Sequence, residues 1–85
     1  MAEVTVAELR HARLMGNTNF RGFDLSGLDL SKVGWLEGCS LLYVNLEGAD
    51  LSGASLSGSN LRGAVHDAHT RWPDGFNVSR EVTVL

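Results

Sequence analysis

A five-residue repeat runs through the middle of this 85-residue chain and limits the folds open to it. Large apolar residues recur every five positions, with one six-residue step between Leu30 and Leu36. The nine apolar centres are Phe20, Leu25, Leu30, Leu36, Leu41, Leu46, Leu51, Leu56 and Leu61. A helix repeats about every 3.6 residues and a strand every 2, so neither keeps all the centres on one face. The period therefore favours a solenoid.

Each repeat unit has the same order of residues around its apolar centre. The residue before the centre is polar in eight of the nine units, with Trp35 as the exception. Glycine stands two places after the centre in seven of the nine units, and Lys32 and Tyr43 replace it in the others. Positions two apart face the same way in extended chain, so we expect the centre and the residue two before it to point inward. The glycine then forms a corner.

This pattern resembles the pentapeptide-repeat family, whose unit is a small residue, Asp or Asn, Leu or Phe, and two variable positions. Residues 49–53, Ala-Asp-Leu-Ser-Gly, match that unit throughout, and the resemblance extends over about residues 17–66. It implies an all-β solenoid, a short right-handed quadrilateral β-helix with four units per coil and about two and a half coils here. The six-residue step predicts a bulged corner around Ser31, Lys32 and Val33.

Both ends of such a solenoid expose backbone groups and apolar core, so both need caps. We divide the single domain, 1–85, into a helical cap over residues 4–16, repeats over 17–68, and an aromatic cap with a tail strand over 69–85. Trp72 and Phe76 flank a Pro-Asp-Gly turn and are expected to lie across the last coil. The apolar run at the end of the tail either folds back along the solenoid or pairs with a second copy as a homodimer.

A capping box predicts the N-terminal helix, because Thr5 is followed three residues later by Glu8. The predicted helix runs from about Val6 to Met15 and is ended by Gly16. Its apolar stripe consists of Leu9, Ala12 and Met15, with Leu14 at the edge. This stripe either closes the first coil or binds a membrane or a partner helix, and we expect the first role.

Three apolar residues, Trp35, Leu42 and Tyr43, interrupt the otherwise polar outer surface. Trp35 occupies an outward polar position, and Leu42 and Tyr43 fill both variable positions of one unit. They either form a partner-binding patch or are covered by the N-terminal helix or the C-terminal tail. The sequence therefore predicts a non-catalytic protein-interaction or scaffold module whose protein partner is unknown.

An acidic surface suggests an alternative function. The net charge of −3 lies on residues 17–68, and stacking every fourth unit brings acidic residues onto neighbouring sides. The residues concerned are Asp24, Asp29, Glu47 and Asp50. The resemblance implies DNA mimicry here, since some members of the family act on DNA gyrase in this way, whereas the simpler interpretation is that the outward position prefers Asp or Asn. Direct binding of nucleic acid is not expected from so few basic residues.

Nothing in the sequence predicts an enzyme, a cofactor or a metal. His66, Asp67 and His69 lack an evident fourth ligand and are interpreted as a decaying repeat rather than as a zinc site. Cys39 occupies a small inward position, where a buried thiol packs like a small hydrophobe. The N-terminus has no basic and apolar leader, and no apolar run approaches the roughly 18 residues of a membrane span. We therefore expect a cytoplasmic bacterial protein that does not bind membranes.

Overall fold

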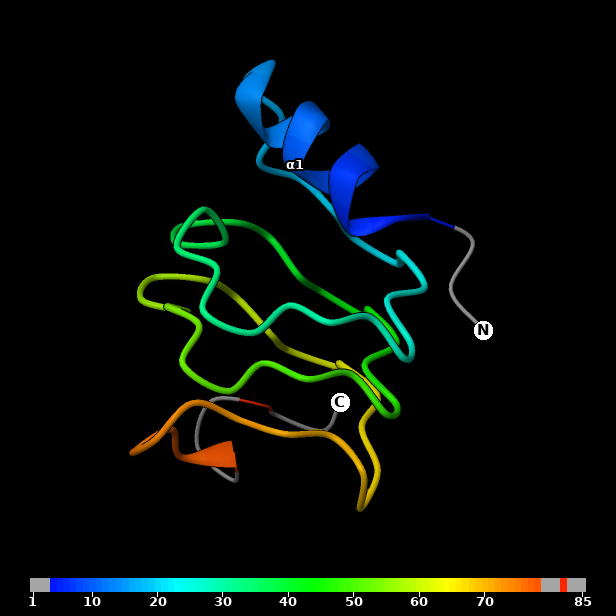
Figure 1. Ribbon diagram of the computed structural model, residues 1–85, viewed down its shortest axis with the longest axis vertical. Coiled ribbons are helices and arrows are strands. Elements are labelled where there is room, and N and C mark those ends of the chain that lie inside the picture. The colour runs from blue at the N-terminus through cyan, green and yellow to red at the C-terminus, as the bar shows by residue number, and fades with distance from the viewer. Residues whose placement is uncertain (1–3, 79–81, 83–85) are drawn as a thin grey trace.

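A helix followed by a stack of coils makes up the computed structural model, which describes residues 4–78 and Val82. Helix α1 (Val6–Leu14) lies at one end of the stack, and residues 71–78 lie at the other (Figure 1). Within the described residues, the sides of the coils are joined by isolated parallel β-bridges and not by longer strands. The expected β-helix is thus present in a form with very short pairing on each side.

The bridges set the length of each coil. They pair Asn19 with Ser40, Asp24 with Asn45, Asp29 with Asp50, Ser40 with Asn60, Asn45 with Val65 and Asp50 with Arg71. Partners stand 20 or 21 residues apart, so each coil takes four five-residue units. The adjacent N–H groups donate to carbonyls of the following coil, as from Leu25 to Asn45 at 2.8 Å. The pairing continues to Arg71, beyond the end of the repeats predicted at residue 68.

The apolar centres form the core of the stack. All nine are at most 7% exposed, and Cys39, Val44, Ala49 and Ala54 are buried at the small inward positions between them. The predicted inward orientation is confirmed for all nine centres and for these four small residues, whereas Phe23, Leu28 and Ser59 are half-buried and Thr18 and Gly34 are exposed at the same position of their units. The core is therefore a continuous apolar column along the axis of the solenoid.

The six-residue step distorts a different corner from the one predicted. Ser31 and Lys32 form an ordinary turn, because Lys32 adopts the left-handed φ of 62° that glycine adopts at the other corners. The register between coils changes from 21 to 20 residues between Val33 and Gly38, where residues 35–38 form a longer turn. The prediction of a bulge at Ser31, Lys32 and Val33 is therefore wrong, and the extra residue is accommodated after Val33.

Helix α1 begins at the predicted capping box. The Thr5 hydroxyl accepts from the Glu8 N–H at 3.1 Å, and the Glu8 carboxylate accepts from the Thr5 N–H at 2.9 Å. Leu9 is 1% exposed and joins the core, so the helix covers the first coil. Gly16 ends it with φ of 93°, and its N–H donates to the Arg13 carbonyl at 3.0 Å.

The predicted apolar stripe of this helix is only partly correct. Leu9 is buried and Ala12 packs against the core, but Leu14 and Met15 are 74% and 75% exposed. The helix ends at Leu14, so Met15 lies in the C-terminal cap and not on the face of the helix that covers the first coil. The stripe that closes the coil is therefore one turn shorter than predicted.

Two aromatic rings cover the other end of the stack. Trp72 and Phe76 are half-buried against the core, with ring centroids 5.1 Å apart and planes at 6°. The Leu51 N–H donates to the Arg71 carbonyl at 2.8 Å, which brings the following Trp72 into register with Leu51. Most of the predicted tail strand falls on residues 83–85, outside the described residues. Val82 is described and is buried.

Candidate functional site

One corner of the solenoid gathers basic, apolar and aromatic side chains from three coils. The Gly22 N–H donates to the Leu42 carbonyl at 2.8 Å, and the Tyr43 N–H donates to the Arg62 carbonyl at 3.1 Å. This register aligns Arg21, Leu42 and Arg62 in successive coils, each directly after an apolar centre. We call Arg21, Leu42, Tyr43 and Arg62 the Tyr43 corner.

Tyr43 is the most unusual member of this corner. It is 43% exposed and adopts a φ of 59° at a position where the coils before and after it have Gly22 and Gly63. The Arg21 guanidinium carbon lies 4.9 Å from the centre of its ring, within cation–π distance. Leu42 is half-buried, and Arg21 and Arg62 are exposed.

Leu42 and Tyr43 are candidate residues from the sequence, whereas the structure adds Arg21 and Arg62 to this site. The information was available, because stacking every fourth unit and counting the extra residue places Arg21, Leu42 and Arg62 in one column. An arginine at an outward position does not depart from the polar outer surface, so only the apolar members of the corner stand out within their own unit.

The structure places Trp35 away from this corner. Trp35 stands on the fourth side of its coil, half-buried against the core. Its carbonyl accepts from the Arg13 Nε at 3.2 Å, which links it to helix α1, and from the Cys39 thiol at 3.6 Å. Of the three predicted patch residues, the structure therefore brings only Leu42 and Tyr43 together.

The outward Asp and Asn side chains have a structural role at the corners. Each accepts, through Oδ1, a hydrogen bond from the N–H of the residue two places later, at distances of 2.9–3.1 Å. The acceptors are Asn19, Asp24, Asp29, Asn45, Asp50 and Asn60. An Asp or Asn side chain can thus satisfy the backbone of its own turn, which explains the preference at this position.

Two of the predicted acidic residues stack on one side of the solenoid. Asp29 and Asp50 pair in adjacent coils, and Arg71 pairs with Asp50 in the next. Hydrogen bonds from the side chain and backbone of Ser31 lower the pKa of Asp29 below its ordinary value of 3.8. Ser52 lowers the pKa of Asp50 in the same way. Both are carboxylates at neutral pH, and the acidic column ends at an arginine.

The other two predicted acidic residues do not extend this column. Asp24 pairs with Asn45, which is uncharged, and lies on the preceding side. Glu47 is exposed at the corner between these sides. In the next coil Asp67 accepts from the Gly48 N–H at 3.0 Å, so the two acidic residues share this corner. The four acidic residues are therefore divided between two sides and a corner.

Comparison with known proteins identifies the repeat. The family model described as pentapeptide repeats (8 copies) matches residues 36–65. These are pentapeptide repeats. The chain is also similar to a pentapeptide repeat protein from Nostoc Pcc 7120 of known crystal structure, with 24% identity, coverage of 91% of this chain and 92% of that one, and a TM-score of 0.47. No curated protein matches the chain.

His66 and Asp67, after the pentapeptide repeats, contact other residues of the chain. His66 meets the Trp72 ring edge-on at 5.6 Å between centroids. Asp67 accepts hydrogen bonds from the Gly48 and His69 N–H groups at 3.0 Å, and from the Thr70 hydroxyl at 3.2 Å. Within the described residues, no three His, Cys, Asp or Glu side chains are grouped so that they could hold a metal ion.

Cys39 is buried inside the pentapeptide-repeat coil, as predicted. Its thiol donates to the Trp35 carbonyl at 3.6 Å, and burial raises its pKa above the ordinary value of 9.0. A reactive cysteine needs an exposed thiolate, so this side chain is suited to packing rather than to nucleophilic chemistry. No helix in the described part of the chain is long and apolar enough to span a bilayer.

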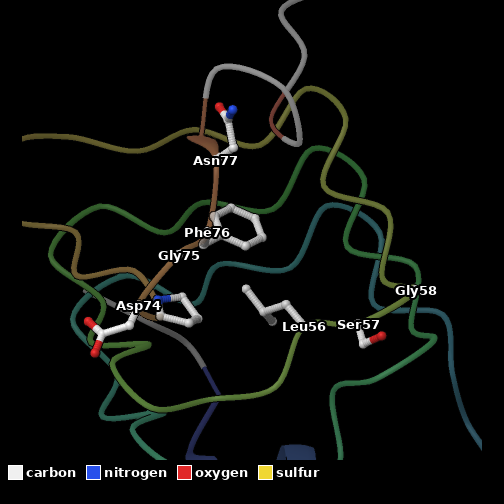
Figure 2. A pocket seen from close by; sticks show the side chains of 8 residues that line it. Leu56, Ser57, Gly58, Asp74, Gly75, Phe76 and Asn77 are labelled. Atoms are coloured by element: carbon white, nitrogen blue, oxygen red, sulfur yellow. The ribbon is translucent and has the colours of Figure 1, made fainter.

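Open cavities lie at both caps of the pentapeptide-repeat stack, and two of them are lined by eight residues each. One, of about 470 Å³, separates the last coil from residues 73–77, and Figure 2 shows Phe76 and Leu56 beside each other there while the Asp74 carboxylate points away. The other, of about 790 Å³, lies where Val4 and Val6 meet the corner at Gly27. Glu47 is the one charged residue that lines the second cavity, so neither gathers a set of catalytic groups.

Proposed function

We propose that this chain is a non-catalytic protein-interaction module that binds its partner through the Tyr43 corner. The observation that carries the proposal is the exposed Tyr43 ring at a left-handed backbone position. A residue with a Cβ at such a φ costs roughly 1 kcal/mol relative to glycine. Tyr43 is 43% exposed, so much of its side chain remains open to a partner. A side chain held at a cost to stability is a candidate for function.

The composition of the corner supports the same role. Exposed tyrosine and arginine side chains are the residues most enriched among the energetically dominant contacts of protein interfaces. Tyr43 has a half-buried Leu42 beside it and Arg21 against its ring, so one small surface offers apolar, aromatic and cationic contacts. Binding requires no movement of the backbone, because the coil fixes all three residues.

Tyr43→Gly tests this function with a matched control. Glycine relieves the backbone at this corner and removes only the ring, whereas Lys32→Gly relieves an equivalent backbone at a different corner. We expect a partner that co-purifies from the source cells with the wild type and Lys32→Gly to be lost with Tyr43→Gly, and to bind the purified wild-type chain directly. A partner retained equally by both variants would refute this role of the corner.

We assign the Trp35 side chain a packing role, because the residue is half-buried and packs against the core. Trp35→Ser is therefore expected to lower the melting temperature while leaving partner binding unchanged at temperatures where the variant is folded. Loss of binding by a variant of unchanged stability would instead return Trp35 to the interaction surface.

DNA mimicry is the second candidate function, and the stacked carboxylates of Asp29 and Asp50 are the observation that favours it. Inhibition of DNA gyrase supercoiling tests it. The double variant Asp29→Asn/Asp50→Asn keeps the side-chain oxygens that cap the corners but removes both charges, so its fold is expected to be intact. Inhibition by the wild type and not by this variant would establish mimicry. Asp24 and Glu47 contribute under this hypothesis through long-range charge alone.

A homodimer through the tail would lengthen the acidic surface, and we propose to test it separately. Light scattering after size exclusion gives the mass of the full chain and of a chain ending at Phe76. A dimer that becomes a monomer on truncation favours the joined rod that mimicry needs. If the full chain and the truncated chain are both monomers, the Tyr43 corner is the better candidate for the interaction surface.

A further inference from the structure

We propose that the partner segment bound at the Tyr43 corner is an extended acidic peptide in which an apolar side chain lies between two carboxylates. The inference rests on the proposed function and names the chemistry of the partner. Arg21 and Arg62 stand one coil before and one coil after Leu42, on the same corner. Coils are spaced by the distance between neighbouring strands, about 4.8 Å, so the two arginine backbones lie roughly 10 Å apart.

Both arginines are available to an external carboxylate. They are exposed, and within the part of the chain that the structure describes neither guanidinium has a hydrogen-bond acceptor or an ion-pair partner. Arg21 is held against the Tyr43 ring, which fixes its position without occupying its N–H donors. Guanidinium groups that bind carboxylates through two N–H donors make the stronger, more directional kind of ion pair.

The charges around the corner determine how a peptide can lie on it. The outward residues of the preceding side, Asn19, Ser40 and Asn60, are uncharged. The next corner along the coil carries Glu47 and Asp67 instead. An acidic segment that crossed from the Tyr43 corner to that corner would pass the side of Asp24 and meet Glu47 and Asp67, whereas one that runs parallel to the solenoid axis follows the column of Arg21 and Arg62. Charge complementarity therefore favours an acidic partner segment and favours its alignment along the solenoid axis.

The spacing of the corner fits an extended peptide. Residues i, i+2 and i+4 of an extended chain point the same way and span about 13 Å. This exceeds the separation of the arginine backbones by roughly 3 Å, a difference that two flexible arginine side chains cover. An acidic residue at i and another at i+4 then face Arg21 and Arg62, and an apolar residue at i+2 meets Leu42 and the Tyr43 ring.

The test uses the full chain and labelled synthetic peptides. A fluorescein-labelled peptide with the core Glu-Thr-Leu-Thr-Glu is titrated with protein, and fluorescence anisotropy reports binding. We expect binding that weakens with added salt, and that falls about tenfold or more in Arg21→Gln/Arg62→Gln. The matched control is Arg10→Gln/Lys32→Gln, which removes two positive charges elsewhere and should leave the affinity unchanged.

Two further probes make the proposal falsifiable. The peptide Gln-Thr-Leu-Thr-Gln should bind at least about tenfold more weakly, since it keeps the apolar side chain and lacks the carboxylates. A labelled single-stranded oligonucleotide should not bind better than the acidic peptide. Equal binding of the neutral peptide, preferred binding of the oligonucleotide, or no binding of the acidic peptide below about 1 mM would each overturn the acidic-peptide assignment.

The same variants separate this inference from the function on which it rests. If Tyr43→Gly loses the cellular partner while Arg21→Gln/Arg62→Gln keeps it, the corner is an interaction surface whose partner is not acidic. If both variants keep the partner, the proposed function itself fails. If both lose it while Lys32→Gly and Arg10→Gln/Lys32→Gln retain it, both proposals stand.

Discussion

The sides and the corners of this solenoid are built from the same five-residue unit but obey different constraints. Along the sides, every apolar centre from Phe20 to Leu61 is Leu or Phe and is at most 7% exposed, because each must fit inside the stack of coils. At the corners, side chains project into solvent and the sequence varies from Gly to Lys to Tyr at one backbone conformation. The sides therefore determine stability, and the corners are free to acquire specificity.

The largest effect is expected from a change inside a side. Leu41 is 1% exposed and lies in register between Phe20 and Leu61. The coils on either side are held by this register, so they cannot move in to fill the cavity that a smaller side chain would leave. Leu41→Ala should lower the free energy of unfolding by about 2–5 kcal/mol, measured by chemical denaturation. Ser40→Ala changes the adjacent outward residue and should cost less than about 0.5 kcal/mol. Equal effects of the two variants would contradict the division between inside and outside.

The aromatic cap should give the next largest effect. Trp72 is half-buried, stacked on Phe76 and met edge-on by His66, so Trp72→Ala should cost about 2 kcal/mol, less than the 3–5 kcal/mol of a fully buried ring. Thermal unfolding followed by circular dichroism measures the loss. Trp72→Phe keeps a ring in the stack and should recover most of the stability. A Trp72→Ala variant as stable as the wild type would show that the last coil needs no aromatic cover.

How far the sequence predicted the molecule follows the same division. The inward positions were predictable because an apolar residue every five positions has one physical explanation, and Phe20 and Leu41 are buried as expected. The bulge was misplaced because periodicity locates an extra residue only to within one step. The exact site of the extra residue depends on the backbone conformation at each corner. Lys32 adopts the left-handed conformation of the glycine corners, so the corner at Lys32 keeps its ordinary shape and the extra residue falls later.

The candidate site was only partly predictable because it is formed between coils. Leu42 and Tyr43 are conspicuous within their own unit, but Arg21 and Arg62 become their neighbours only through a register of 20 or 21 residues. Trp35 was misleading for the opposite reason. It is conspicuous within its unit, yet the chain turns it against the core, where its carbonyl meets Arg13.

A smaller effect, of opposite sign, is expected at a corner that has no proposed function. Lys32→Gly places glycine at a φ of 62° and should raise the free energy of unfolding by about 0.5–1 kcal/mol. Gly53 is the equivalent corner in the next coil, and a Cβ there would come within 3.1 Å of the Lys32 Cγ. Gly53→Ala should therefore lower the free energy of unfolding, measured by chemical denaturation. If Lys32→Gly instead destabilises, the lysine side chain contributes more than its backbone costs.

The smallest effect concerns the carboxylates that cap the corners. The Ser31 hydroxyl and N–H lower the pKa of Asp29, and hydrogen bonds from Ser52 and from Gly48 do the same for Asp50 and Asp67. A pKa lower in the folded than in the unfolded chain gives a stabilisation that is complete above the unfolded value, near 3.8, and is lost as the pH falls through the folded value. Thermal unfolding should therefore show stability that is constant from pH 7 to about 5 and decreases below 4.

Because Asn keeps the capping oxygen without titrating, Asp29→Asn/Asp50→Asn should show a shallower decrease. If the stability of that variant decreases with falling pH as steeply as that of the wild type, other acidic groups cause the loss of stability in acid. The corners would then be held by backbone geometry more than by charge.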